Sequence, residues 1–135
     1  MAFRQWTDDK SNYTPPIIML PSTASEAYKL GEMLVVDATT GALTKCAADA
    51  KPTYLCMEEY TAPATGNRDI RVVRVSPTTI YHTTFVADAT NNKEGTLVTL
   101  HTDGLQVTAT ATNGDFEIVK KLGTGNKDEV LVRVP

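Results

Sequence analysis

The sequence predicts an all-β fold, a small single-domain β-barrel or sandwich with an extended N-terminal arm and at most one short helix. Short runs alternate threonine, valine or isoleucine with other residues, a pattern that packs well on a pleated sheet. Turn signals recur about every ten residues, as in sandwiches and barrels. The 135 residues fit one domain and are enough to bury a hydrophobic core.

The first element is an arm, residues 1–21, which precedes a β-rich body at residues 22–135. Trp6, the only tryptophan, lies in a polar stretch that does not read as core. Pro15 and Pro16 favour an extended backbone ahead of a short apolar run at residues 17–20. The arm is therefore expected to be extended, with large apolar side chains that need shelter from water.

The body begins with the only helical signature, at residues 22–30, where a serine can cap a short turn and Gly31 can end it. Alternating patterns then predict the first strands of the body, with Gly41 available for a turn of positive φ. These strands are expected at residues 32–37, 42–46, 53–59, 69–76 and 79–86. The alternation in 69–76 changes phase near Val73, which indicates a β-bulge.

The C-terminal part predicts a three-stranded meander and a closing strand. Asp-Gly and Asn-Gly pairs, which favour tight hairpin turns, separate residues 96–101, 105–112 and 115–122. In the middle strand, valine and alanine alternate with threonine, so the threonines are expected on a solvated face. Residues 129–134 form the last expected strand.

Two cysteines, Cys46 and Cys56, could face each other across a hairpin, which makes a disulfide geometrically possible. Because no secretion signal is visible, a reducing cytoplasm is expected, and the favoured interpretation is two small buried apolar residues. A zinc site that adds His82 and His101 would need a spacing that matches no common pattern. No metal site is therefore expected.

The sequence also predicts that the protein is not an enzyme. It lacks a nucleophile motif, and neither histidine lies in a recognisable catalytic pattern. Glu58 and Glu59 are neighbours on an expected strand, so they point to opposite faces and cannot easily work as a pair. No catalytic residue and no cofactor are expected.

Charge and hydropathy exclude two classes of partner. The formal net charge is −3, and the basic residues are scattered, so nucleic acid is not an expected partner. No run approaches the roughly 18 apolar residues of a membrane span, so a membrane is not expected either.

The layout resembles the head decoration (capsid cement) proteins of tailed bacteriophages. A polar arm leads into KLGEMLVVDATTGALTKC, in which Gly31, Asp37 and Gly41 match the opening of the small β-domain of that group. RDIRVVRVSPTTIYHTTF, the GTLVTLHTDGLQVTATATNGDFEIVKKLG meander and a final VLVRVP complete the likeness over about residues 28–135. Where the fuller pattern has a further glycine after the third strand, this chain has Cys56-Met57-Glu58.

The resemblance implies a structural virion protein on the outer capsid surface, made in the host bacterial cytoplasm and present as a homotrimer. Its partner would be the major capsid protein, whose neighbouring subunits it would clamp together. An arm of this kind can bury aromatic anchors against the shell or add to a sheet edge. The expected capsid contacts are Phe3, Arg4, Trp6, Tyr13, Ile17 and Ile18.

Alternatives remain open at each of these positions. Residues 17–20 can equally fold back across the chain's own barrel, whereas for Phe3 and Trp6 an outside partner is favoured. The loop that contains Thr65, Asn67 and Arg68 is a candidate contact between subunits, or simply a surface loop. The competing function is a carbohydrate- or cell-surface-binding β-module, for which Tyr54, Tyr60 and Tyr81 are the candidate aromatic residues.

Overall fold

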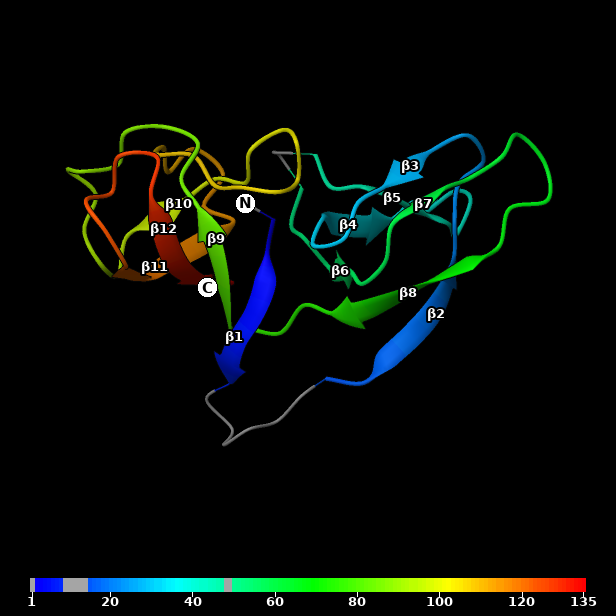
Figure 1. The fold of residues 1–135 in the computed structure, drawn as a ribbon, viewed down its shortest axis with the longest axis horizontal. Helices are drawn as coiled ribbons and strands as arrows, with labels where there is room; N and C mark the ends of the chain where they lie inside the picture. Colours follow the sequence, from blue (N-terminus) through cyan, green and yellow to red (C-terminus); the bar gives the residue numbers. More distant parts are fainter. Residues whose placement is uncertain (1, 9–14, 48–49) are drawn as a thin grey trace.

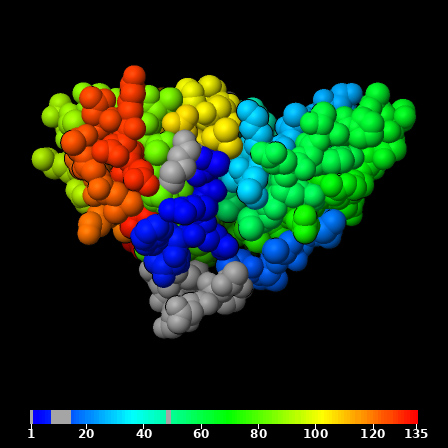
Figure 2. Space-filling view, viewed as in Figure 1, coloured from blue at the N-terminus to red at the C-terminus, as the bar shows by residue number. Residues whose placement is uncertain are grey.

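A computed structural model of the chain describes residues 2–8, 15–47 and 50–135. Within these residues, twelve strands and no helix form two five-stranded antiparallel sheets and one two-stranded sheet. The all-β prediction is confirmed, and the sheets are not closed into a barrel. The large sheets occupy the two arms of a V-shaped molecule (Figures 1 and 2).

The first sheet has the strand order β1-β9-β12-β11-β10 and the second has the order β2-β8-β6-β4-β5. The strands of the first sheet are β1 (Arg4–Asp8), β9 (Thr79–Thr84), β10 (Leu97–Val98), β11 (Phe116–Lys121) and β12 (Glu129–Arg133). Those of the second are β2 (Ile17–Pro21), β4 (Met33–Val36), β5 (Leu43–Lys45), β6 (Tyr54–Cys56) and β8 (Asp69–Arg74). The small sheet pairs β3 (Ala27–Tyr28) with β7 (Tyr60–Thr61).

With the exception of one strand, each large sheet is formed by one continuous part of the chain. Residues 17–74 supply the second sheet and the small sheet, and residues 79–133 supply the first sheet except for β1. β1 pairs with β9 at the edge of the first sheet, although the next described strand, β2, lies at the edge of the second (Figure 1). The N-terminal residues therefore add one edge strand to each large sheet.

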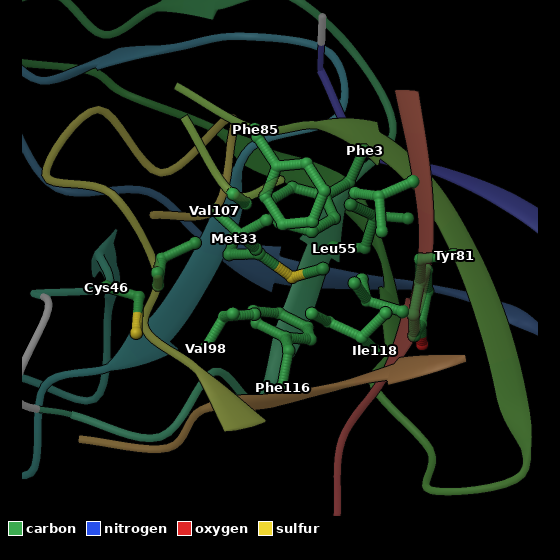
Figure 3. Close-up of a cluster of buried hydrophobic side chains, with 14 of the residues drawn as sticks. Phe3, Met33, Cys46, Leu55, Tyr81, Phe85, Val98, Val107, Phe116 and Ile118 are labelled. Carbon is green, nitrogen blue, oxygen red and sulfur yellow. The ribbon is translucent and has the colours of Figure 1, made fainter. Parts of the chain in front are cut away.

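The main hydrophobic core lies between the two large sheets. Met33 and Leu55 from the second sheet meet Tyr81, Phe116 and other side chains from the first (Figure 3). A second cluster fills the space between the opposite face of the second sheet and the small sheet, and it contains Tyr28, Leu34, Leu43, Cys56, Ile70 and Val72. The second sheet is thus buried on both faces over its middle strands.

Burial on both faces explains why the phase change in residues 69–76 did not mark a bulge. Val72 packs into the outer cluster and Val73 into the main core, so consecutive valines both have apolar surroundings. The register of β8 with β2 and with β6 runs without a shift. The predicted bulge is therefore wrong, and the register shifts that do occur fall in β1 and β11.

Two other expected elements differ from the structure. Residues 22–30 contain β3 instead of a helical turn, and Tyr28 is buried with its hydroxyl donating to the Leu43 carbonyl over 2.7 Å. Residues 105–112 form no regular strand, only bridges from Val107 to Leu100 and to Phe85. Val107 alone of its alternating series is fully buried, and the alanines that follow have too little apolar surface to hold a strand in place.

Cys46 and Cys56 are both buried. Cys46 belongs to the main core and Cys56 to the outer cluster, so the second sheet separates the two thiols. Burial raises the pKa of the Cys56 thiol. The favoured interpretation, two small buried apolar residues, is confirmed.

Candidate interaction surface

Phe3 anchors β1 to the body from the inside. Its ring is only 3% exposed and stacks on Phe116 with 5.1 Å between ring centroids. Its amide donates to the Gly31 carbonyl over 3.1 Å. Gly31 has φ +83°, and a Cβ there would lie 2.5 Å from the Phe3 carbonyl oxygen. The expectation that Phe3 contacts a partner is therefore corrected, because its ring completes the chain's own core.

Trp6 points the other way, onto the outer face of the first sheet. It falls at the register shift between Gln5 and Thr7, so the strand bulges and presents Trp6 outward. The indole is 51% exposed and covers the imidazole of His82, with 5.1 Å between ring centroids. Trp6 is therefore half available to a partner, as an interface residue must be.

A hydrogen-bonded chain of polar groups lies beneath the indole. Arg4 donates from Nε to His82 Nδ1 over 2.8 Å, and its guanidinium lies 5.7 Å from the Trp6 ring. His82 is buried, and its Nε2 is 2.8 Å from a carboxylate oxygen of Glu129. Because Nδ1 accepts a hydrogen bond, Nε2 carries the proton in this arrangement. These contacts among Arg4, His82 and Glu129 link β1, β9 and β12 and hold the Trp6 side chain in place.

Three neighbouring residues of β2 expose large apolar side chains. Ile17 is 57% exposed, Ile18 37% and Met19 51%. β2 is the end strand of its sheet and pairs only with β8 among the described strands. A groove of about 550 Å³ lies beside it, lined by Pro15, Pro16, Ile18 and residues 74–78. The exposure of Ile17 and Ile18 is what a contact with a partner requires, and Tyr13, the remaining expected contact, lies outside the described residues.

The candidate subunit-contact loop is engaged with the chain itself. Asn67 donates from its side chain to the Ser22 carbonyl. Arg68 forms a two-pronged hydrogen bond with Glu58 at 3.2 and 3.0 Å and stacks over Tyr60. The hydrogen bond from Arg68 is the main cause of a lowered pKa of Glu58. Thr65 stays exposed, so the tip of the loop is open while its C-terminal side is fixed.

The tyrosines considered for glycan binding do not form a shared exposed face. Tyr81 is fully buried in the main core. Arg74 lies over the Tyr54 ring, as Arg68 does over the Tyr60 ring. Tyr81 therefore cannot contribute to a surface site, and Tyr54 and Tyr60 are half-buried, each with a guanidinium over one face of its ring.

Two buried acids escaped prediction because no sequence pattern distinguishes them from surface residues. Glu32 is almost fully buried, lies 3.5 Å from Lys45 Nζ and accepts a hydrogen bond from the Lys29 amide. Burial raises the pKa of Glu32. Asp115 is equally buried and accepts a hydrogen bond from the Leu100 amide over 2.9 Å. Each acid holds neighbouring backbone in place by accepting a hydrogen bond from an amide, which is a structural role.

In the described part of the chain, no group of three or more histidine, cysteine or acidic side chains could hold a metal ion. Nor do the described ranges contain a helix long and apolar enough to cross a membrane. Comparisons with protein-family models and with curated proteins found no match for the chain.

Proposed function

We propose that this chain is a structural virion protein that binds the outer surface of a tailed-phage capsid and stabilises contacts between major capsid protein subunits. The observation that supports it most is the half-exposed Trp6, held on the outer face of a sheet whose inner face is well packed. Aromatic side chains that stay exposed on a packed domain are typical of protein interfaces. The resemblance described above supplies the kind of partner.

In this proposal, the face built on β1 contacts the capsid protein. Trp6 buries its exposed half against the shell, and Arg4 supplies a cation beside it for a carboxylate or carbonyl of the partner. Phe3 contributes from inside by fixing the strand that carries both residues. Because β1 is already ordered, little conformational entropy is lost when the face docks.

The test is binding to expanded heads of tailed phages, measured by co-sedimentation. Replacing Trp6 by alanine should weaken binding by about 30-fold, which corresponds to roughly 2 kcal/mol for a well-buried anchor. Leu122→Ala is the matched control. Leu122 is an exposed apolar residue that directly follows β11, away from β1 in the sheet order, so its loss should leave binding unchanged. Circular dichroism should show that both variants fold.

Two results would reject the proposal. One is head binding by the Trp6→Ala protein equal to that of the unaltered chain. The other is no head binding by the unaltered chain together with specific binding to a glycan array, which would favour the carbohydrate-binding alternative. The array separates the two functions because capsid recognition gives no reason to expect glycan binding.

A further inference from the structure

The free edges of the two large sheets differ in how they are protected. β1 carries a register shift, β10 has two residues, and β5 has three and ends in Lys45. Bulges, short length and charges are the usual devices that keep a sheet edge from pairing with another chain. β2 is five residues long, has no charged residue, and keeps an unshifted register with β8. Between Ile17 and Leu20 this edge has none of these protections, and only Pro21, which has no amide hydrogen, limits how far a ladder could extend.

The backbone groups on that edge follow from the pairing of β8. The Arg71 carbonyl accepts from the Met57 amide, and the Arg71 amide donates to Glu58, so Arg71 faces away from β2. Groups on successive residues of a strand alternate in direction, so Val72 faces β2 and pairs with Ile18. Ile17, Met19 and Pro21 therefore direct their backbone groups outward, to the side on which the described residues place no strand.

This edge is complementary to itself. If two copies pair antiparallel with Ile18 opposite the partner's Ile18, then Ile17 lies opposite the partner's Met19. Each of these residues can donate a hydrogen bond from its amide to the carbonyl of the residue opposite. Its own carbonyl can accept a hydrogen bond from the amide of that same opposite residue. The next outward positions on either side are Pro15 and Pro21, which have no amide hydrogen. The pairing therefore leaves no outward amide of the strand without an acceptor.

Side chains and charge fit the same arrangement. The pairing buries the apolar side chains of Ile17, Ile18 and Met19 of each copy, which rank among the most exposed large apolar side chains in the structure. No charge lies on β2, so a chain of net charge −3 meets its copy here without like charges at the seam. The groove beside Pro16 and Ile18 leaves room next to the end of the partner's strand.

We propose that two copies of this chain associate about a twofold axis through antiparallel pairing of their β2 strands, centred on Ile18. The second sheets of the two copies then form one continuous sheet of ten strands, twice the five of one copy. The seam is small, so a dissociation constant on the order of 10 μM is expected. This assembly differs from the homotrimer that the family resemblance implies.

The first test is the mass of the protein in solution, measured by light scattering during size exclusion at about 100 μM, well above the expected dissociation constant. The unaltered chain should have an average mass close to twice the 14.6 kDa of one copy, because most copies are paired at this concentration. Met19→Lys should weaken association by about tenfold or more, because it places a charge on the seam of each copy. Leu97→Lys is the matched control, since Leu97 is an exposed apolar residue on another edge strand, and it should remain a dimer.

A cross-link tests the register and does not depend on the folding of the lysine variant. Residue 18 and its copy form a pair without mutual backbone hydrogen bonds, with Cα atoms about 4.5 Å apart, which a disulfide can span. Ile18→Cys should therefore give a covalent dimer under mild oxidation, and Leu97→Cys should not. The native cysteines are buried and should not contribute.

A single-copy or threefold mass at about 100 μM, equal effects of the two lysine substitutions, or equal cross-linking of the two cysteine variants would each overturn the pairing. The pairing does not rest on the capsid proposal. A monomer that binds heads would contradict the pairing alone, and a β2-paired dimer that fails to bind heads would contradict the capsid proposal alone.

Discussion

Replacing Phe3 by alanine should destabilise the whole domain, although Phe3 lies close to the chain terminus. The substitution removes a ring that is almost completely buried and that stacks on Phe116 in the main core (Figure 3). Phenylalanine-to-alanine changes in cores cost about 3–5 kcal/mol, and partial collapse around a site near the edge of the core favours the lower part of that range. We therefore expect a loss of about 3 kcal/mol in the free energy of unfolding.

The assay is urea-induced unfolding followed by far-UV circular dichroism, with thermal unfolding as a second measurement. For a domain of this size, about 3 kcal/mol corresponds to a fall in melting temperature of roughly 10 °C. Leu122→Ala is the control, because Leu122 is also a large apolar residue but is largely exposed and lies in neither proposed interface, so its loss should cost less than about 0.5 kcal/mol. Equal stability of the two variants would refute the placement of Phe3 in the core.

Three further outcomes are expected. Gly31→Ala should destabilise the chain by more than about 1 kcal/mol in urea unfolding, because a Cβ there meets the backbone of β1 and the φ of +83° is strained for alanine; an unchanged midpoint would contradict that contact. Arg68 lowers the folded-state pKa of Glu58, so this carboxylate stabilises the fold above its unfolded pKa, and the stabilisation is lost as pH falls through the folded pKa. Glu58→Gln should therefore reduce the loss of stability on acidification below about pH 4.5, and an unchanged pH profile would refute the contribution. Both native cysteines should react with a thiol reagent only as fast as the protein opens, and immediate labelling in the folded state would show that they are not buried.

Much of the body could be predicted because it obeys simple patterns. β4, β5, β6, β8 and β9 all lie within the expected strand ranges, since each combines alternation with a nearby turn signal. The C-terminal hairpin of β11 and β12 also fell within its expected ranges. The strand predicted at residues 105–112 is absent because alternation alone does not supply a pairing partner, and only Val107 makes bridges there.

The docking of β1 could not be predicted, because its cause lies far away in the sequence. Phe3 is separated from Trp6 by polar residues, so the stretch has neither a helical nor a clean strand period. The bulge at Trp6 breaks the alternation of inward and outward side chains. The core that buries the Phe3 ring is assembled from both halves of the chain. Only the packing against Phe116 distinguishes an inward anchor from an outward one.

The edge position of β2 was also beyond the sequence. Residues 17–20 were expected either to contact a partner or to fold back across the chain's own domain, and only the sheet order shows that they form an edge strand. Met19 was not among the expected contacts, although it belongs to the same apolar run as Ile17 and Ile18 and is as exposed as Trp6. Edge position is a property of topology, which local sequence does not encode.

The N-terminal residues form a docked strand, with Phe3 buried on its inner side and Trp6 exposed on its outer side. The decisive measurement is hydrogen exchange, followed by mass spectrometry, on the peptide that covers β1. The β1 amides that face β9, its partner strand, should exchange slowly, with protection close to that of β9. Complete exchange of the β1 amides within seconds, while β9 stays protected, would contradict this docking of β1.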